Sequence, residues 1–123
     1  MAMRVLIVED EMTIAFMVED MLTDLGHDVV EVAMRLPEAL EAARGVDIDF
    51  AILDVSLDGL RSFPVADILA ERAIPFAFAT GYGAAGIDEA YRDTPVLAKP
   101  FMLDDLRRLV ARIVGECRPP HIQ

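Results

Sequence analysis

The sequence predicts an α/β protein, built on a five-stranded parallel sheet with helices on both faces. Short apolar runs alternate with segments of helical periodicity, which is typical of a parallel sheet with crossover helices. Runs such as Val5–Val8 are apolar throughout, and this pattern indicates strands that are buried on both faces. The length of 123 residues suits one domain, and a hydrophobic content of 54% excludes a disordered chain.

The first half of the chain predicts two strands and two helices. Val5–Val8 forms the first strand, and Met12–Leu25 follows as a helix that ends at a glycine. Five apolar residues share the expected inner face of this helix: Ile14, Met17, Met21, Leu22 and Leu25. Val29–Val32 forms the second strand. Pro37 then begins a short helix, Pro37–Gly45, because proline suits the first turn of a helix.

The second half predicts three more strands and three helices. The strands share a short apolar composition: Phe50–Leu53, Phe76–Ala79 and Val96–Ala98. Helices are expected at Pro64–Leu69 and, with a strong apolar stripe, at Leu103–Ile113. Gly81–Arg92 contains three glycines and predicts only a weak helix. We expect one domain over residues 1–115 and a frayed tail over residues 116–123.

Charge and cysteine content exclude several classes of protein. Eleven basic and 22 acidic residues leave a net charge of −11, so we expect neither nucleic acid nor a membrane as a partner. A single cysteine excludes internal disulfides and a zinc cluster. The N-terminus has no signal-peptide pattern, and no apolar stretch reaches the roughly 20 residues that span a bilayer. The predicted location is therefore cytoplasmic, and the two histidines are expected to be solvent-exposed.

Polar side chains end four of the five predicted strands. Glu9 and Asp10 follow the first strand, Asp54 the third, Thr80 the fourth and Lys99 the fifth. Ligands of open α/β sheets bind outside the carboxyl ends of the strands, so we expect these side chains to converge on one crevice.

The carboxylates among them predict a metal site. Glu9, Asp10 and Asp54 would repel one another unless a cation lies between them, and Val5–Met34 contains eight acids and no lysine or arginine. Carboxylate oxygens without histidine or cysteine select a hard ion, and Mg²⁺ suits a small site of this kind. The alternative is that acids after a strand are solvated loop or capping residues, and we adopt that interpretation for Glu11.

Lys99 is the only lysine, whereas the other ten basic residues are arginines. A compact ammonium suits a phosphoryl group beside a metal better than a planar guanidinium does. The alternative for Lys99 is an ordinary salt bridge with Asp54. For Thr80, the alternative is a hydroxyl that caps the next turn.

The strand-end residues form one joint pattern: Glu9 with Asp10, Asp54, Thr80, and Lys99 with Pro100. This pattern resembles the receiver domain of two-component response regulators, and the resemblance extends from Arg4 to Val114. It implies the flavodoxin-like receiver fold with strand order 2-1-3-4-5.

The resemblance also implies a role for each residue. Asp54 would accept a phosphoryl group from a kinase phosphohistidine, and a carboxylate can act as such a covalent nucleophile. Asp10 and Asp54 would bind Mg²⁺ directly, Glu9 would act through water, and Ser56 would add its backbone carbonyl. The residues that would hold the phosphoryl oxygens are Thr80 and Lys99, which suits a reaction that needs alignment and charge neutralisation.

The sequence departs from the common receiver pattern in two places. Val96 stands where the family usually has an aromatic switch residue, and the turn after Asp54 lacks the usual proline. The run Phe78–Tyr82 instead resembles the atypical "FAT GUY" subgroup of receivers. We therefore expect a switch in which Thr80 moves toward the phosphoryl group, Gly81–Tyr91 becomes ordered and Tyr82 packs down.

The resulting functional prediction is a stand-alone receiver that catalyses only its own phosphorylation and dephosphorylation. Its partners would be a sensor histidine kinase or phosphotransfer protein and a downstream protein target, unless it acts as a phosphate sink. One alternative is a receiver cut from a hybrid histidine kinase. Another is an aspartyl-phosphate phosphatase of the haloacid dehalogenase type, which requires a second aspartate where this chain has Ser56.

Overall fold

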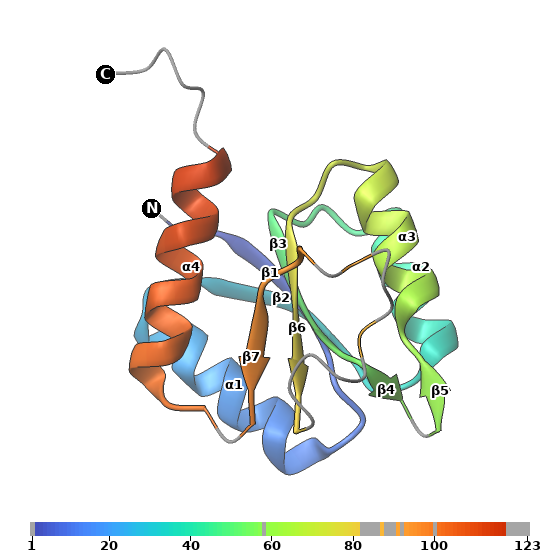
Figure 1. Ribbon diagram of the computed structural model, residues 1–123, viewed down its shortest axis with the longest axis horizontal. Helices are drawn as coiled ribbons and strands as arrows, with labels where there is room; N and C mark the ends of the chain where they lie inside the picture. Colours follow the sequence, from blue (N-terminus) through green and yellow to red (C-terminus); the bar gives the residue numbers. More distant parts are fainter. Residues whose placement is uncertain are drawn as a thin grey trace.

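A computed structural model describes residues 2–57, 59–81, 87, 91, 93–99 and 101–117. Its centre is a five-stranded parallel sheet in the order β2-β1-β3-β6-β7 (Figure 1). The strands are β1 (Arg4–Val8), β2 (Asp28–Ala33), β3 (Phe50–Asp54), β6 (Phe76–Thr80) and β7 (Val96–Ala98). Counted along the chain, these strands have the order 2-1-3-4-5, so the predicted fold is confirmed.

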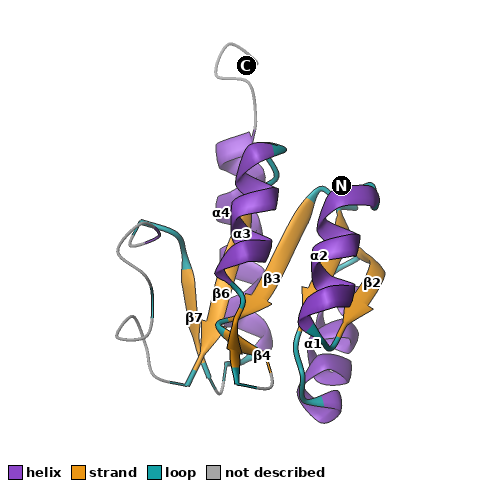
Figure 2. Cartoon of the chain, turned by 90° about the vertical axis from the view of Figure 1, so that its right-hand side faces the viewer, coloured by secondary structure: helices purple, strands orange, loops and turns teal. Residues whose placement is uncertain are grey.

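Helices cover both faces of the sheet. Those described are α1 (Met12–Asp24), α2 (Leu36–Gly45), α3 (Phe63–Glu71) and α4 (Leu103–Cys117). α1 and α4 lie on one side and α2 and α3 on the other, and Figure 2 views the molecule with α2 and α3 in front of the sheet. None of the described helices is long and apolar enough to cross a bilayer.

The strand side chains divide between two apolar cores because successive residues of a strand point to opposite faces. Val5 and Ile7 belong to the cluster formed with α1 and α4, whereas Leu6 and Val8 belong to the cluster formed with α2 and α3. These four side chains of β1 are all buried, whereas its first residue, Arg4, is exposed. Burial on both faces explains why the strands read as continuous apolar runs.

Two local expectations need correction. In α1 the buried residues are Ala15, Val18 and Leu22, while Met17 is 39% exposed instead of facing the core. His27 is half-buried rather than exposed, and its Nδ1 accepts a hydrogen bond of 3.0 Å from the backbone N–H of Met3.

Two further expectations fall partly outside the described residues. Of the expected weak helix over residues 81–92, only residues 81, 87 and 91 are described. α4 continues to Cys117, two residues into the expected tail, and residues 118–123 are not described.

The sequence did not predict a short antiparallel hairpin that follows β3. It consists of β4 (Ser56–Leu57) and β5 (Leu60–Arg61). Gly59 in the connection has a φ of +84°, a backbone conformation that glycine adopts without steric cost. Figure 1 places the hairpin at the carboxyl edge of the sheet, beside the ends of β3 and β6.

Candidate functional site

A pocket of about 750 Å³ opens at the carboxyl edge of the sheet. Residues from the ends of β1, β3 and β6, from the hairpin and from the segment after β7 line it. The polar lining residues are Glu9, Asp10, Glu11, Asp54, Ser56, Arg61, Thr80 and Lys99. Every site residue predicted from the sequence therefore meets in this pocket except Tyr82, which lies outside the described residues.

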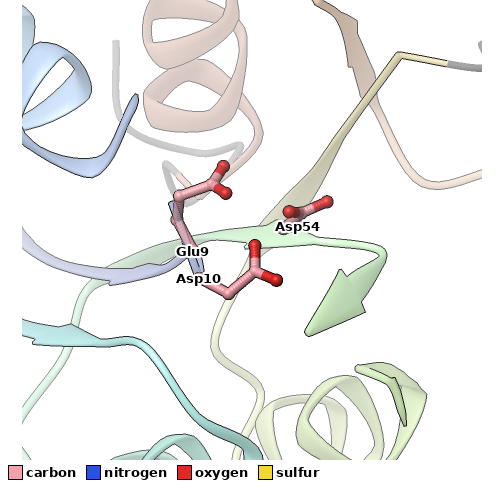
Figure 3. Close-up of side chains that lie close together, drawn as sticks. All are labelled: Glu9, Asp10 and Asp54. Atoms are coloured by element: carbon pink, nitrogen blue, oxygen red, sulfur yellow. The ribbon is translucent and has the colours of Figure 1, made fainter. Parts of the chain in front are cut away.

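Three carboxylates converge at the centre of the pocket. Val8 and Leu53 pair across the parallel strands β1 and β3, so the next residues, Glu9 and Asp54, come side by side. Asp10 follows Glu9, and one oxygen from each of the three groups lies within 4.8 Å of the others. Figure 3 shows the carboxylates of Glu9, Asp10 and Asp54 close together, with Asp54 beside the other two. Glu9 is buried, Asp54 is half-buried and Asp10 is exposed.

Lys99 brings one ammonium group to these carboxylates. Its backbone N–H donates to the Thr80 carbonyl at 2.9 Å, which continues the pairing of β7 with β6 beyond the strand end. Its Nζ donates to Glu9 Oε1 at 2.7 Å and lies 3.4 Å from Asp54 Oδ2. The salt bridge considered for Lys99 and Asp54 is thus present, but the shorter contact is with Glu9.

Burial and charge shift the pKa values of this pair. The pKa of the Glu9 carboxyl is raised from 4.5 to about 7, mainly because burial disfavours the charged form. The hydrogen bond from Lys99 opposes this rise, and the charge of Asp54 adds to it. Burial alone would lower the pKa of Lys99, but the hydrogen bond to Glu9 and the charges of both carboxylates raise it. Among the described residues that line the pocket, four acids thus face two cations, Lys99 and Arg61, which leaves an excess of negative charge.

Thr80 and Ser56 complete the polar wall. Thr80 ends β6 and is only 3% exposed, so its side chain is held inside the pocket wall. Ser56 is exposed, and its backbone N–H donates to Asp54 Oδ1 at 3.4 Å. This contact orients the carboxyl group of Asp54 from its own strand end.

The donor set fits a hard divalent cation such as Mg²⁺. Carboxylate oxygens without histidine or sulfur ligands favour such ions, and a cation would relieve the excess negative charge. Both oxygens of Glu9 already accept hydrogen bonds, one from Lys99 and the other from the backbone N–H of Glu11 at 3.2 Å. Glu9 is the most buried of the three carboxylates and Asp10 the most exposed, so Asp10 is the one most accessible to a hydrated ion.

A family model described as the response regulator receiver domain matches residues 5–111. The chain belongs to this family. The strand order of the sheet and the acidic cluster at its carboxyl edge agree with that assignment.

Related proteins support the assignment over almost the whole receiver. The solution structure of SdrG from Sphingomonas melonis Fr1 has a TM-score of 0.83 at 44% identity, covering 92% of this chain and 97% of SdrG. The BeF3-activated conformation of SdrG from Pseudomonas melonis Fr1 has a TM-score of 0.78 at 45% identity, covering 90% of this chain and 95% of SdrG. The transcriptional regulatory protein TcrA of Mycobacterium tuberculosis is 35% identical over 130 residues, which cover 98% of this chain and 50% of TcrA. This receiver thus spans about half the length of the curated relatives it matches.

Sequence reasoning left two charged residues of the receiver pocket, Glu11 and Arg61, out of the predicted site. Arg61 reaches the pocket because the β4–β5 hairpin turns the chain back toward Ser56. The available signal was the dipeptide Asp58-Gly59, which is typical of two-residue hairpin connections. Strands of two residues are too short to show any periodicity of their own.

Proposed function

We propose that this receiver is a phosphorylation-controlled switch whose Asp54 accepts a phosphoryl group. The donor would be a phosphohistidine of a sensor histidine kinase or a phosphotransfer protein. The supporting observation is the arrangement around Asp54, which has two further carboxylates within 4.8 Å and the Lys99 ammonium at 3.4 Å. A nucleophile, a cation site and a group suited to phosphoryl oxygens are therefore neighbours in one pocket.

The transfer exchanges one bond for another at phosphorus. An oxygen of the Asp54 carboxylate attacks the phosphorus and forms the acyl phosphate. The phosphorus–nitrogen bond of the donor breaks, and its electron pair goes to the imidazole nitrogen, which takes a proton from solvent. Such a reaction depends mainly on alignment and on neutralisation of charge, both of which a preformed pocket can supply.

The pocket residues would divide this work. Asp10, Asp54 and the Ser56 carbonyl would hold Mg²⁺, with Glu9 acting through water, and the ion would neutralise charge on the phosphoryl oxygens. Lys99 would shift part of its contact from Glu9 and Asp54 to a phosphoryl oxygen. The Thr80 hydroxyl would donate a hydrogen bond to another phosphoryl oxygen.

We propose that exposed apolar side chains close in sequence to pocket residues form the surface on which a protein donor docks. Met12 and Phe16 of α1 are 57% and 49% exposed, and Met102, three residues after Lys99, is 70% exposed. Large exposed apolar groups are common at protein-binding sites and are costly to leave in water. Methionine also adapts its shape to different partners, which suits a transient complex.

The switch itself is proposed to act through Thr80 and the chain that follows it. Val96 replaces the usual aromatic residue on the last strand, and the run Phe78–Tyr82 supports membership of the "FAT GUY" subgroup. Among the described residues of this region, Tyr91 stacks on Phe63 with ring centroids 5.8 Å apart, and its hydroxyl hydrogen-bonds to Asp67 of α3. Movement of Thr80 toward a phosphoryl group would pull on the segment between Thr80 and Tyr91. Tyr82 belongs to this segment and is proposed to pack down when the segment becomes ordered.

The biological output is proposed as regulated binding of a downstream protein target in the cytoplasm, or as a phosphate sink. The near-complete coverage of SdrG supports a receiver that acts alone. TcrA is about twice as long, so a receiver that belongs to a larger protein, such as a hybrid histidine kinase, is the competing proposal. Apart from its own phosphorylation and dephosphorylation, the receiver would catalyse no reaction.

Phosphorylation of two matched variants tests this proposal. With Mg²⁺ and phosphoramidate as a small phosphorus–nitrogen donor, the wild-type protein should incorporate phosphoryl groups and Asp54→Asn should not. Asp47→Asn is the control, because Asp47 is an exposed aspartate paired with Arg4 away from the pocket, and it should be labelled normally. Normal labelling of Asp54→Asn would refute the assignment of Asp54.

A further inference from the structure

The β4–β5 hairpin positions an arginine at the rim of the receiver pocket. Ser56 and Arg61 are direct cross-strand partners, so their side chains lie on the same face of the hairpin. Both residues line the pocket. The neighbouring Leu57 is 1% exposed and packs into the core beneath α2 and α3, which fixes the hairpin to the body of the domain. The place of Arg61 is therefore set by the backbone.

Arg61 and Lys99 are the two cations among the described residues that line the pocket, against four acids. Lys99 is largely buried and already contacts Glu9 and Asp54. Arg61 is exposed at the pocket rim, where a phosphoryl donor must enter. An incoming phosphoryl dianion therefore meets an excess of negative charge that Lys99 alone does not offset.

We propose that Arg61 binds the phosphoryl group during its transfer to Asp54, an inference that rests on the proposed phosphorylation of Asp54. A guanidinium can donate two parallel hydrogen bonds to two phosphoryl oxygens, which a lysine ammonium cannot. Lys99 would hold the group from inside the pocket and Arg61 from its rim. Arg61 has an interaction partner in the unphosphorylated protein, so it would exchange that partner for phosphoryl oxygens.

The test compares Arg61→Gln with Arg44→Gln in the full chain. Both variants lose one positive charge from an exposed arginine. Arg44 lies in the last turn of α2, at the end of the helix remote from the carboxyl edge of the sheet. Phosphorylation rates are measured with Mg²⁺ and phosphoramidate, a donor without a protein surface, so that effects on partner docking do not contribute. Mg²⁺ affinity, beryllofluoride affinity and thermal stability are measured alongside.

Arg61→Gln should be phosphorylated about tenfold more slowly than the wild type, which is typical of one lost charge-assisted hydrogen bond in a hydrated site. Beryllofluoride, which imitates the phosphoryl group, should bind more weakly. The affinity for Mg²⁺ should stay equal or rise, because a positive charge has been removed near a cation site. Arg61→Lys should fall between wild type and Arg61→Gln, and Arg44→Gln should match the wild type.

Equal phosphorylation rates for Arg61→Gln and Arg44→Gln would overturn the inference. A parallel fall in Mg²⁺ affinity, thermal stability and phosphorylation rate would also overturn it, since it would assign Arg61 a purely structural role in the hairpin. A rate for Arg61→Lys equal to that of the wild type would also overturn it, because an ammonium cannot donate the two parallel hydrogen bonds. Labelling of Asp54→Asn would instead refute the proposed function, so the two failures are distinguishable.

Discussion

Two ion pairs on different parts of the receiver have similar lengths and very different surroundings. Arg4, the first residue of β1, lies 2.8 Å from Asp47, and the two side chains are 48% and 77% exposed. Lys99 lies 2.7 Å from Glu9 beyond the other end of β1, and these side chains are 18% and 5% exposed. The first pair is solvated by water, whereas the second is enclosed by protein.

This difference decides what each pair can do. Water screens the exposed pair, so its two residues are free to separate at little cost in free energy. Enclosure of Glu9 raises its pKa to about 7 and leaves Lys99 as the nearest compensating charge. The pocket therefore has an excess of negative charge, which binding of a metal ion or a phosphoryl group can change. The exposed pair has one positive and one negative charge and no such excess.

The largest effect is expected from exchanging the cation of the enclosed pair. Lys99→Arg should reduce phosphorylation of Asp54 by about 10- to 100-fold, because the larger guanidinium cannot keep the Nζ position between Glu9 and Asp54. The rate of phosphoryl incorporation from phosphoramidate measures this effect. Arg4→Lys is the matched control at the exposed pair and should leave the rate unchanged.

Equal rates for wild type and Lys99→Arg, with equal affinity for a downstream partner, would reduce Lys99 to a structural ion pair. Circular dichroism of the variant must first confirm that the fold is intact.

An intermediate effect is expected from the raised pKa of Glu9. In the metal-free protein Glu9 ionises near pH 7 when folded and near pH 4.5 when unfolded, so the folded state binds more protons between these values. Glu9 should therefore lower the free energy of unfolding as pH rises through this window, by at most about 3 kcal/mol. Urea unfolding in the presence of a chelator should show this slope for wild type and lose it for Glu9→Gln.

Glu41→Gln provides the control, because Glu41 is exposed on α2, does not line the receiver pocket and should keep the wild-type slope. Identical pH dependence of wild type and Glu9→Gln would contradict the description of Glu9 as a desolvated carboxyl.

The smallest effect is expected at the exposed pair. Arg4→Gln should change the free energy of unfolding by no more than about 0.5 kcal/mol, because surface ion pairs contribute little. Urea denaturation at neutral pH measures it. A decrease in the free energy of unfolding above about 2 kcal/mol would contradict the claim that the exposed ion pair contributes little to stability.

The sheet and most of the site could be predicted because burial of the strands on both faces determines the sequence pattern of both. Strands buried on both faces, such as Phe50–Asp54, must be apolar until they reach solvent. The first polar residue after the apolar run therefore marks the carboxyl edge, and parallel strands bring those residues together. Asp54, Thr80 and Lys99 were found in this way.

Other features depend on packing that no local pattern records. The contact of Lys99 with Glu9 joins residues 90 positions apart, and it is shorter than the contact of Lys99 with Asp54. The hydrogen bond from the Met3 backbone N–H to His27 likewise depends on how β2 enters the sheet. Arg61 reached the pocket through a hairpin with strands too short for periodicity to reveal.

The most direct test is to locate the phosphoryl group on the chain. After incubation with Mg²⁺ and phosphoramidate, borohydride reduction converts an acyl phosphate into an alcohol that peptide mass spectrometry can assign. We expect a single modified residue, Asp54, and no reduction at Glu9 or Asp10. Modification of Asp10 or Glu9 with an unmodified Asp54 would contradict this expectation.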